Sequence, residues 1–288
     1  MPSPIVILAS DTGWHTDELC RAVRARGHEP LLLPWEANVN RLGTGSGVSN
    51  SGHALANARA VLPRIIPSGS LEQIIYRVDT LHRLADAGVR VMNSGRAIER
   101  TVDKAWTSAI LEQAGLPTPE TVACERADDA FAAFHRMGDV VVKPLFGSMG
   151  LGMTRVSDPD VAWRVFRAVE AMRGVFYVQR FVNHGGRDIR AFVIGDQVFG
   201  AIERTADDWR TNFSRGGKVA RCTLPAAWAA LAVRAAQAVG AEYAGVDLLP
   251  DGAGGVYLLE VNGIPGWEGL QQATGLDVSG AIVTQLLA

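Results

Sequence analysis

Short apolar runs and amphipathic stretches alternate along the first part of the chain. Residues 5–9 form an apolar run that ends in a Ser-Asp-Thr-Gly segment, which is typical of a buried strand followed by a loop. Residues 16–26 place Leu19 and Val23 on one face of a helix, and residues 28–33 favour another strand. This order predicts a chain that begins with a βαβ unit.

The following segments differ in composition. Residues 38–52 are rich in Gly, Ser and Asn, which predicts a mobile loop. Residues 70–87 repeat apolar side chains at helical spacing, and residues 89–93 favour a strand. We therefore expect an N-terminal α/β domain over residues 1–95.

From residue 96 onward the pattern is a mixture of helices and adjacent strands. Predicted strands cover residues 120–124, 139–144, 175–182, 189–194, 197–205, 243–249 and 256–261. Predicted helices cover residues 103–114, 127–137, 159–172, 226–239 and 277–287. Because several strands follow one another without a helix between them, we expect the second domain, residues 96–288, to be α+β.

Composition narrows the class of protein. The net charge of −2 lacks the basic excess that is typical of nucleic-acid binding, so we expect no nucleic-acid partner. The first residues do not have the pattern of a signal peptide, and no later apolar run reaches the length of a membrane span. The three cysteines are far apart and odd in number, which argues against a disulfide framework or a zinc site. These features favour a cytoplasmic protein without a membrane partner.

Candidate chemistry begins at Lys143, at the end of an apolar strand. The glycine-rich segment Gly147–Gly152 follows it, and backbone N–H groups in such a segment can surround an anion such as a polyphosphate. The pattern is neither a Walker A motif, in which lysine follows the glycines, nor a dinucleotide fingerprint. A structural hairpin turn is the alternative.

A second motif places acidic and amide oxygens on paired strands. Glu260 and Asn262 are two residues apart in a strand, so both point to one face, and Asp247 lies in the preceding strand where it can face them. Two carboxylates and an amide oxygen suit Mg²⁺, which also keeps waters and phosphate oxygens as ligands. The alternative is a polar patch whose members satisfy one another.

Arginines form the third motif. Arg190 and Arg204 fall on two strands that are predicted to pair, and Arg215 follows within a polar segment. Guanidinium groups bind carboxylates and phosphates through two parallel hydrogen bonds. Taken singly, each could equally be a surface salt-bridge residue.

Together, the ordered motifs resemble the ATP-grasp superfamily and, within it, the RimK-type α-L-glutamate ligases. The resemblance runs from about Ile74 to the C-terminus. It is carried by Tyr76–Leu81, Asn93–Ser94, Val102–Lys104, Leu116–Thr121, the Lys143 segment, Arg187–Arg190, Asn212–Gly217, Gly245–Asp247 and Leu259–Gly266. It implies an ATP-grasp fold with an N-terminal pre-ATP-grasp domain, a central lid over about 104–178 and a catalytic lobe over about 179–288.

The resemblance also implies roles for individual residues. Contacts with the ATP phosphates would come from Lys104, Lys143, Ser148, Gly150 and Gly152. Gln179 and Phe181 would form the hinge that meets adenine, and Asp188 would lie near the ribose. The Mg²⁺ ligands would be Asp247, Glu260 and Asn262, with Mn²⁺ as an alternative metal. The transferred phosphate or the acceptor carboxylate would be contacted by Arg190, Arg204, Asn212 and Arg215.

The implied activity is ATP-dependent formation of an amide through an acylphosphate, with ADP as a product. By resemblance, L-glutamate would supply the amine and a small-molecule or coenzyme carboxylate would accept it. A LysX-like or D-alanine-ligase-like amide ligase is an alternative, as is an ATP-binding regulatory module without catalysis. A dehydrogenase is remote because the first loop lacks a dinucleotide glycine pattern. A homo-oligomer is compatible with the sequence.

Overall fold

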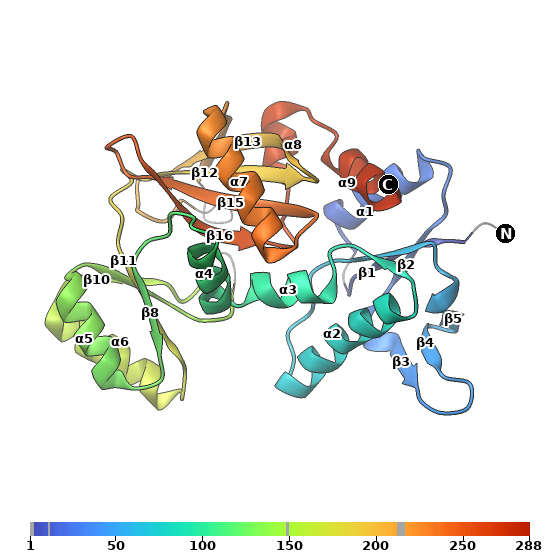
Figure 1. The fold of residues 1–288 in the computed structure, drawn as a ribbon, viewed down its shortest axis with the longest axis horizontal. Coiled ribbons are helices and arrows are strands. Elements are labelled where there is room, and N and C mark those ends of the chain that lie inside the picture. The colour runs from blue at the N-terminus through green and yellow to red at the C-terminus, as the bar shows by residue number, and fades with distance from the viewer. Residues whose placement is uncertain (1–2, 11, 148–149, 212–216) are drawn as a thin grey trace.

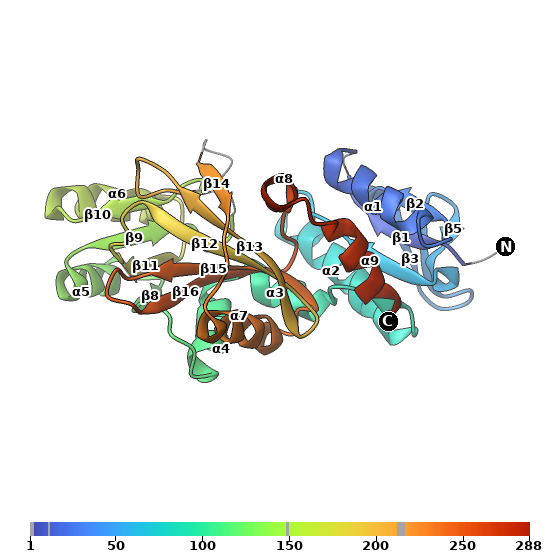
Figure 2. The ribbon, with the colours of Figure 1, turned by 90° about the horizontal axis from the view of Figure 1, so that it is seen from above.

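We describe the protein from a computed structural model, in which residues 3–10, 12–147, 150–211 and 217–288 are described. A four-stranded sheet with its helices lies at one end of the molecule and two further sheets lie toward the other (Figures 1 and 2). The mixed α/β and α+β class is confirmed.

The N-terminal sheet has the order β2-β1-β6-β7 and is parallel throughout. Its strands are β1 (Ile5–Leu8), β2 (Pro30–Leu33), β6 (Ala60–Pro63) and β7 (Arg90–Val91). Helices α1 (Trp14–Arg24) and α2 (Leu71–Asp86) connect these strands. Every residue of β1 is buried, as the uninterrupted apolar run predicts for a strand covered on both faces.

The prediction of a mobile loop over residues 38–52 is wrong. This segment contains β3 (Asn38–Arg41) and β4 (Gly47–Asn50), which form an antiparallel sheet with β5 (His53–Ala54). The buried side chains of Asn38 and Asn50 face each other across the strands, and Asn50 Nδ2 donates to Asn38 Oδ1 at 2.7 Å. Asparagine here satisfies a buried pair, whereas composition alone favours a turn.

The second sheet has the order β10-β9-β11-β8 and is antiparallel. Its strands are β8 (Thr121–Cys124), β9 (Val140–Lys143), β10 (Thr154–Val156) and β11 (Phe176–Arg180). Helices α5 (Ala127–Met137) and α6 (Pro159–Ala171) cover one face through a core that contains Phe134, Phe166 and Phe176 (Figure 1). The opposite face, which carries Lys143, is left open to the third sheet.

The third sheet is antiparallel, with the order β14-β13-β12-β15-β16. Its strands are β12 (Arg187–Ile194), β13 (Gln197–Thr205), β14 (Lys218–Arg221), β15 (Tyr243–Pro250) and β16 (Val256–Asn262). The linking helix α3 (Gly95–Val102) leads into α4 (Lys104–Gln113), which packs with α7 (Ala226–Val239) beside this sheet (Figure 2).

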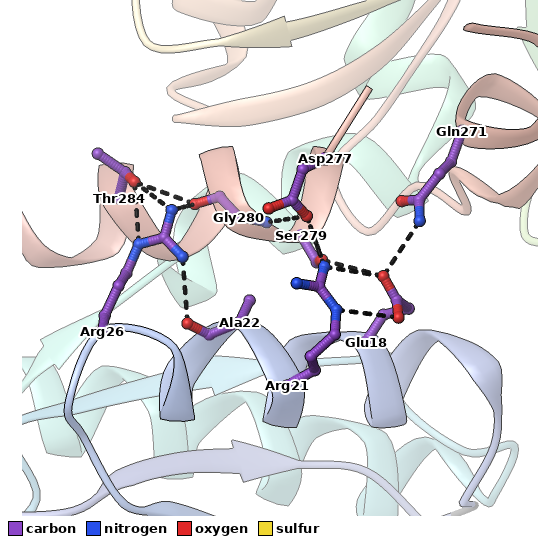
Figure 3. A network of polar contacts seen from close by, with 9 residues as sticks. All are labelled: Glu18, Arg21, Ala22, Arg26, Gln271, Asp277, Ser279, Gly280 and Thr284. Carbon is purple, nitrogen blue, oxygen red and sulfur yellow. Dashed lines mark hydrogen bonds and ion pairs between the residues drawn. The ribbon is translucent and has the colours of Figure 1, made fainter. Parts of the chain in front are cut away.

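After β16 the chain passes through α8 (Glu268–Thr274) and returns to the N-terminal domain as α9 (Val278–Leu287). Helices α1 and α9 lie side by side (Figures 2 and 3). Their polar contacts include Arg21 Nη2 to Asp277 Oδ1 at 2.5 Å, and Arg26 donates to Thr284 and to the Gly280 carbonyl. Leu19, Val23 and Ile282 of the same two helices share one buried apolar cluster.

The division of the chain into two domains at residue 95 stays a prediction.

The sequence patterns did not predict several short strands and helices. The strands β6, β10 and β14 and the helices α3 and α8 have three to eight residues each, too few to show a clear period. Within the described ranges, no helix has the length and apolar character needed to cross a bilayer.

The α1–α9 contact predicts unequal costs for two substitutions. Ile282→Ala removes a fully buried side chain and should lower the free energy of unfolding by about 2–5 kcal/mol. Arg26→Met removes partly exposed polar contacts of the same helix pair and should cost less than about 1 kcal/mol. Urea denaturation of both variants measures the difference, and equal costs would show that polar contacts hold the two helices together.

Candidate active site

An open cavity lies between the second and third sheets, with about 850 Å³ of empty space when its solvent-filled mouth is included. Its walls come from α4, β9 and β11 on one side and from β12, β13, β15 and β16 on the other. Of the residues singled out from the sequence, it brings together Lys104, Lys143, Gly150, Gln179, Phe181, Asp188, Arg204, Asp247 and Glu260. Residues separated by up to 156 positions in the chain thus share one cavity.

Charged residues form a row across the third sheet, which we call the charge ladder: Arg204, Asp188, Arg190, Asp247 and Glu260. All of them except Arg190 line the cavity. The strand register places Asp188 opposite Arg204, Arg190 opposite Asp247, and Asp247 opposite Glu260. Because directly opposed residues lie on the same face of a sheet, all five side chains gather on the cavity side. Acidic and basic groups therefore alternate from β13 to β15, and a second acid, Glu260, follows Asp247 on β16.

The ladder is held by paired hydrogen bonds. Arg204 donates to both oxygens of Asp188 at 2.7 and 2.6 Å, and its Nη2 also donates to Asp247 Oδ2 at 2.8 Å. Arg190 donates to both oxygens of Asp247, each at 2.7 Å. Such two-pronged bonds between guanidinium and carboxylate fix orientation as well as distance.

The electrostatic balance differs along the ladder. Burial alone would raise the pKa of Asp247, but Arg190 and Arg204 hold it well below its usual range. Burial would likewise lower the pKa of Arg204, which Asp247 and Asp188 instead raise. Glu260 is the exception: burial and then the charge of Asp247 raise its pKa, since its nearest guanidinium contact, with Arg190, is 3.6 Å long. A cation beside Glu260 would offset this repulsion.

Two lysines face the ladder from the other wall. Lys143 is 8% exposed, and its Nζ donates to Gln179 Oε1 at 2.6 Å. Burial lowers the pKa of Lys143 to about 8. Lys104 begins α4 and donates to the carbonyl of Gly147 at 2.7 Å, and burial lowers its pKa as well. The two ammonium groups therefore line the cavity opposite Glu260, whose charge partly offsets the lowering of the pKa of both lysines by burial.

Buried hydrogen bonds connect Lys143 to α4. Gln179 Nε2 donates to Thr121 Oγ1 at 2.9 Å and to the Tyr177 hydroxyl at 3.2 Å. That hydroxyl lies 2.8 Å from Ser108 Oγ on α4. The network fixes the Gln179 amide so that its oxygen faces Lys143.

The predicted metal ligands lie at one end of the ladder. Both oxygens of Asp247 accept from arginines, Glu260 is half-buried, and Asn262 Oδ1 accepts from the backbone N–H of Ile264 at 3.1 Å. In the described part of the chain, no three His, Cys, Asp or Glu side chains form a group that could hold a metal without help. Two carboxylates and one amide oxygen nevertheless fit Mg²⁺, which takes remaining ligands from water and phosphate.

The other predicted residues lie in different places. Arg190 donates to Asp247 but does not line the cavity wall. Asn262 and Gly152 do not line the wall either. At Gly152, φ is +74° and an added Cβ would lie 2.7 Å from Pro144, so the turn requires glycine. Ser148, Asn212 and Arg215 fall outside the described residues.

Sequence reasoning missed the apolar walls of the cavity, which include Val141, Met153, Leu249 and Leu259. For two of them, Val141 and Leu249, the sequence contains a pattern that could have predicted their position. Val141 stands two residues before Lys143, and Leu249 stands two residues after Asp247, so the strand period puts each on the cavity face. It also missed Trp209 and His184, which lie in loops where no period applies.

Arg204 predicts a large loss of stability when its charge is removed. Arg204→Met would leave Asp188 and Asp247 buried with fewer partners, so the free energy of unfolding should fall by about 3–5 kcal/mol. Arg187→Met on the adjacent strand breaks only a half-exposed contact with Glu203 and should cost less than about 1 kcal/mol. Urea denaturation of both variants tests this, and a mild loss in Arg204→Met would mean that the ladder contributes little to folding.

Comparison with known proteins agrees with this geometry. The model of the RimK-like ATP-grasp domain matches residues 101–286. The chain is 31% identical to the tetrahydromethanopterin:alpha-L-glutamate ligase of Methanosarcina acetivorans, over 98% of this chain and 97% of that protein. It is 33% identical to a probable alpha-L-glutamate ligase of Trichodesmium erythraeum, over 97% of this chain and 94% of the relative.

Solved structures share the fold. The ATP-grasp ligase PsnB, in complex with a minimal precursor, superposes with a TM-score of 0.80 at 24% identity, over 99% of this chain and 100% of that one. A RimK domain ATP-grasp protein of Sphaerobacter thermophilus gives a TM-score of 0.77 at 24% identity, over 99% and 100%. With the cavity, the matched domain and full-length relatives in agreement, the chain belongs to the RimK-like ATP-grasp family of ATP-dependent ligases.

Proposed function

We propose that the protein uses ATP and Mg²⁺ to join the amine of L-glutamate to a carboxylate of a small-molecule or coenzyme acceptor. The observation that carries the proposal is the cavity in which buried Lys143 faces Glu260 and the charge ladder. The lysines on one wall can bind the phosphates of a nucleotide. Glu260 on the other wall, whose charge is only weakly offset by Arg190, can bind the metal ion that accompanies them.

In this proposal, one set of cavity residues binds the nucleotide and another set binds the metal. Lys143 and Lys104 would neutralise phosphate oxygens, and the backbone around Gly150 would surround them. The β11 segment from Gln179 would meet the adenine ring, with Val141, Met153 and Leu249 as apolar walls and Asp188 toward the ribose. Asp247, Glu260 and Asn262 would hold Mg²⁺, or Mn²⁺ in its place. The bound metal would supply charge neutralisation at the phosphates.

Two chemical steps follow from this arrangement. An oxygen of the acceptor carboxylate attacks the γ-phosphorus of ATP, the bond to the β-phosphate oxygen breaks, and ADP leaves. The glutamate amine then attacks the acyl carbon, phosphate departs with the acyl oxygen, and the amine proton passes to phosphate. Both reactants of the first step are anions, so charge neutralisation by the lysines carries the catalysis, and Arg190 and Arg204 orient Asp247 beside the reactants.

Glutamate is supported by the abundance of guanidinium groups. A dicarboxylate amino acid brings two anionic groups, which planar guanidinium groups bind better than ammonium groups do. Arg210 lines the cavity and is paired to Asp208, and Asn212 and Arg215, which lie outside the described residues, remain candidates in the same segment. Relatives named for alpha-L-glutamate ligation favour the same amine, and the Methanosarcina relative favours a coenzyme acceptor.

A substrate screen tests the proposal. With ATP, Mg²⁺, an amino-acid panel and candidate coenzyme carboxylates, we expect ADP and an acceptor that gains the mass of one glutamate residue. Aspartate, one methylene shorter, should be used about 10–200-fold less efficiently. Mass spectrometry reads both. AMP as product would refute the acylphosphate, whereas preference for a neutral or basic amino acid would favour a LysX-like or D-alanine-ligase-like activity.

Lys143 predicts proton uptake when the nucleotide binds. With a pKa near 8 in the empty protein, Lys143 is about half neutral at pH 8, and a phosphate oxygen beside it should restore the charge. Binding of an ATP analogue should therefore take up about half a proton at pH 8, and affinity should fall as pH rises above 8. Calorimetry in two buffers of different ionisation enthalpy measures the uptake.

Lys143→Arg is the matched control because arginine stays protonated at this pH. Most of the uptake should disappear in this variant, while a smaller part from Lys104, whose pKa burial also lowers, remains. Unchanged uptake in Lys143→Arg would place the titrating group elsewhere.

A further inference from the structure

Lys143 is a buried cation that is held by a neutral group. Its Nζ donates to the amide oxygen of Gln179 at 2.6 Å. The acids across the cavity, Asp247 and Glu260, form their ion pairs with arginines of the charge ladder and act on Lys143 only through their charge. A buried ammonium group needs a hydrogen-bond acceptor, and here an amide provides it.

The side chains around this contact share the cavity face of the second sheet. The strand register places Tyr177 opposite Lys143, and Gln179 opposite Thr121. Because Tyr177 and Gln179 are two residues apart in β11, both point to the same face. Gln179 is 2% exposed and Tyr177 is 1% exposed, so their hydrogen bonds are shielded from bulk solvent.

The donors and acceptors of this network fix the direction of the Gln179 amide. Thr121 Oγ1 donates its own hydrogen to a backbone carbonyl at 2.8 Å, so it can only accept from Gln179 Nε2. The Tyr177 hydroxyl accepts from the same Nε2 at 3.2 Å, which leaves its hydrogen for Ser108 Oγ, 2.8 Å away. A reversed amide would place its NH₂ group against the ammonium group of Lys143, so the amide oxygen faces Lys143.

These contacts leave the Gln179 side chain without a free donor for an adenine ring. Both hydrogens of Nε2 are used within the network, and the amide oxygen accepts from Lys143. Recognition of the base then falls to other groups of the hinge segment. The side chain of Gln179 influences a bound nucleotide through Lys143.

The neutrality of the amide matters for a cation that attracts phosphate. A carboxylate in the same place would form an ion pair with Lys143 and cancel its charge, whereas the amide fixes the ammonium group and leaves that charge in the cavity. The network also ends at Ser108 on α4, the helix that Lys104 begins. The hydrogen bonds that hold Lys143 thus connect it to the element that carries the second lysine.

We propose that Gln179 is a positioning residue for the nucleotide phosphates, because its amide holds Lys143 at the cavity wall without neutralising it. The inference rests on the proposed function for the identity of the ligand. It predicts that binding of a nucleotide with phosphates depends on the Gln179 side chain, whereas binding of the nucleoside adenosine does not.

A double-mutant cycle on the whole chain tests the proposal, with calorimetry of two probes, Mg·ADP and adenosine. Gln179→Met is similar in size but apolar, and it should weaken Mg·ADP binding by about five- to tenfold. In the Lys143→Met background the same substitution should change Mg·ADP affinity by less than about twofold, because the group through which it acts is gone. Adenosine affinity should stay within about twofold in all variants, which also shows that the base pocket is intact.

Gln179→Glu keeps the test decisive if Gln179→Met does not fold, because Lys143 retains a partner of the same shape. The new carboxylate should neutralise Lys143 and weaken Mg·ADP binding by at least about tenfold, with adenosine binding unchanged. It should also raise the pKa of Lys143, so the proton uptake on Mg·ADP binding at pH 8 should fall. Gln197→Glu, at the exposed start of β13, adds the same charge elsewhere and should leave both affinities unchanged.

The outcomes separate this inference from the proposed function. Equal weakening of Mg·ADP binding by Gln179→Met with and without Lys143 overturns the inference, since Gln179 would then act independently of Lys143. Parallel loss of adenosine and Mg·ADP binding also overturns it, because the side chain would then serve the base pocket. Failure of the wild type to bind Mg·ADP overturns the proposed function and, with it, this role of Gln179.

Discussion

The charge ladder across β13, β12, β15 and β16 is the constraint on which the rest of the structure depends. Asp247 is fully enclosed, and it can remain ionised there only because Arg190 and Arg204 each contact it. Arg204 is itself neutralised by Asp188. Strand register, rather than flexible side chains, sets these distances, so the same pairing that closes the sheet also shapes the floor of the cavity. Stability and substrate binding therefore draw on the same residues.

The two walls of the cavity belong to separate sheets. The ladder is part of a continuous five-stranded sheet, whereas Lys143 belongs to a separate sheet that reaches α4 through Gln179, Tyr177 and Ser108. An acidic floor held by paired hydrogen bonds, under a separately supported cationic wall, suits a site that must admit and release a nucleotide.

Much of the fold and of the site could be predicted from the sequence, because long strands and helices carry clear periods. The two-residue spacing of Glu260 and Asn262, with Asp247 in the partner strand, was enough to expect one shared face, and the register confirms that Asp247 and Glu260 are opposed. Residues 38–52 were misjudged because buried asparagines imitate a turn composition. Trp209 and His184 were not singled out, since both lie in loops where no period marks a cavity-facing side chain.

The central claim is that the Glu260 end of the ladder binds the metal that accompanies the nucleotide. Calorimetry of a non-hydrolysable ATP analogue, with and without Mg²⁺, tests it most directly in the wild type and in Glu260→Gln. We expect Mg²⁺ to strengthen binding in the wild type and this gain to fall by about tenfold or more in the variant, as the loss of a metal contact usually does. Without Mg²⁺ the variant should bind at least as well, since a repelling charge is gone. An equal gain from Mg²⁺ in both proteins would contradict the account.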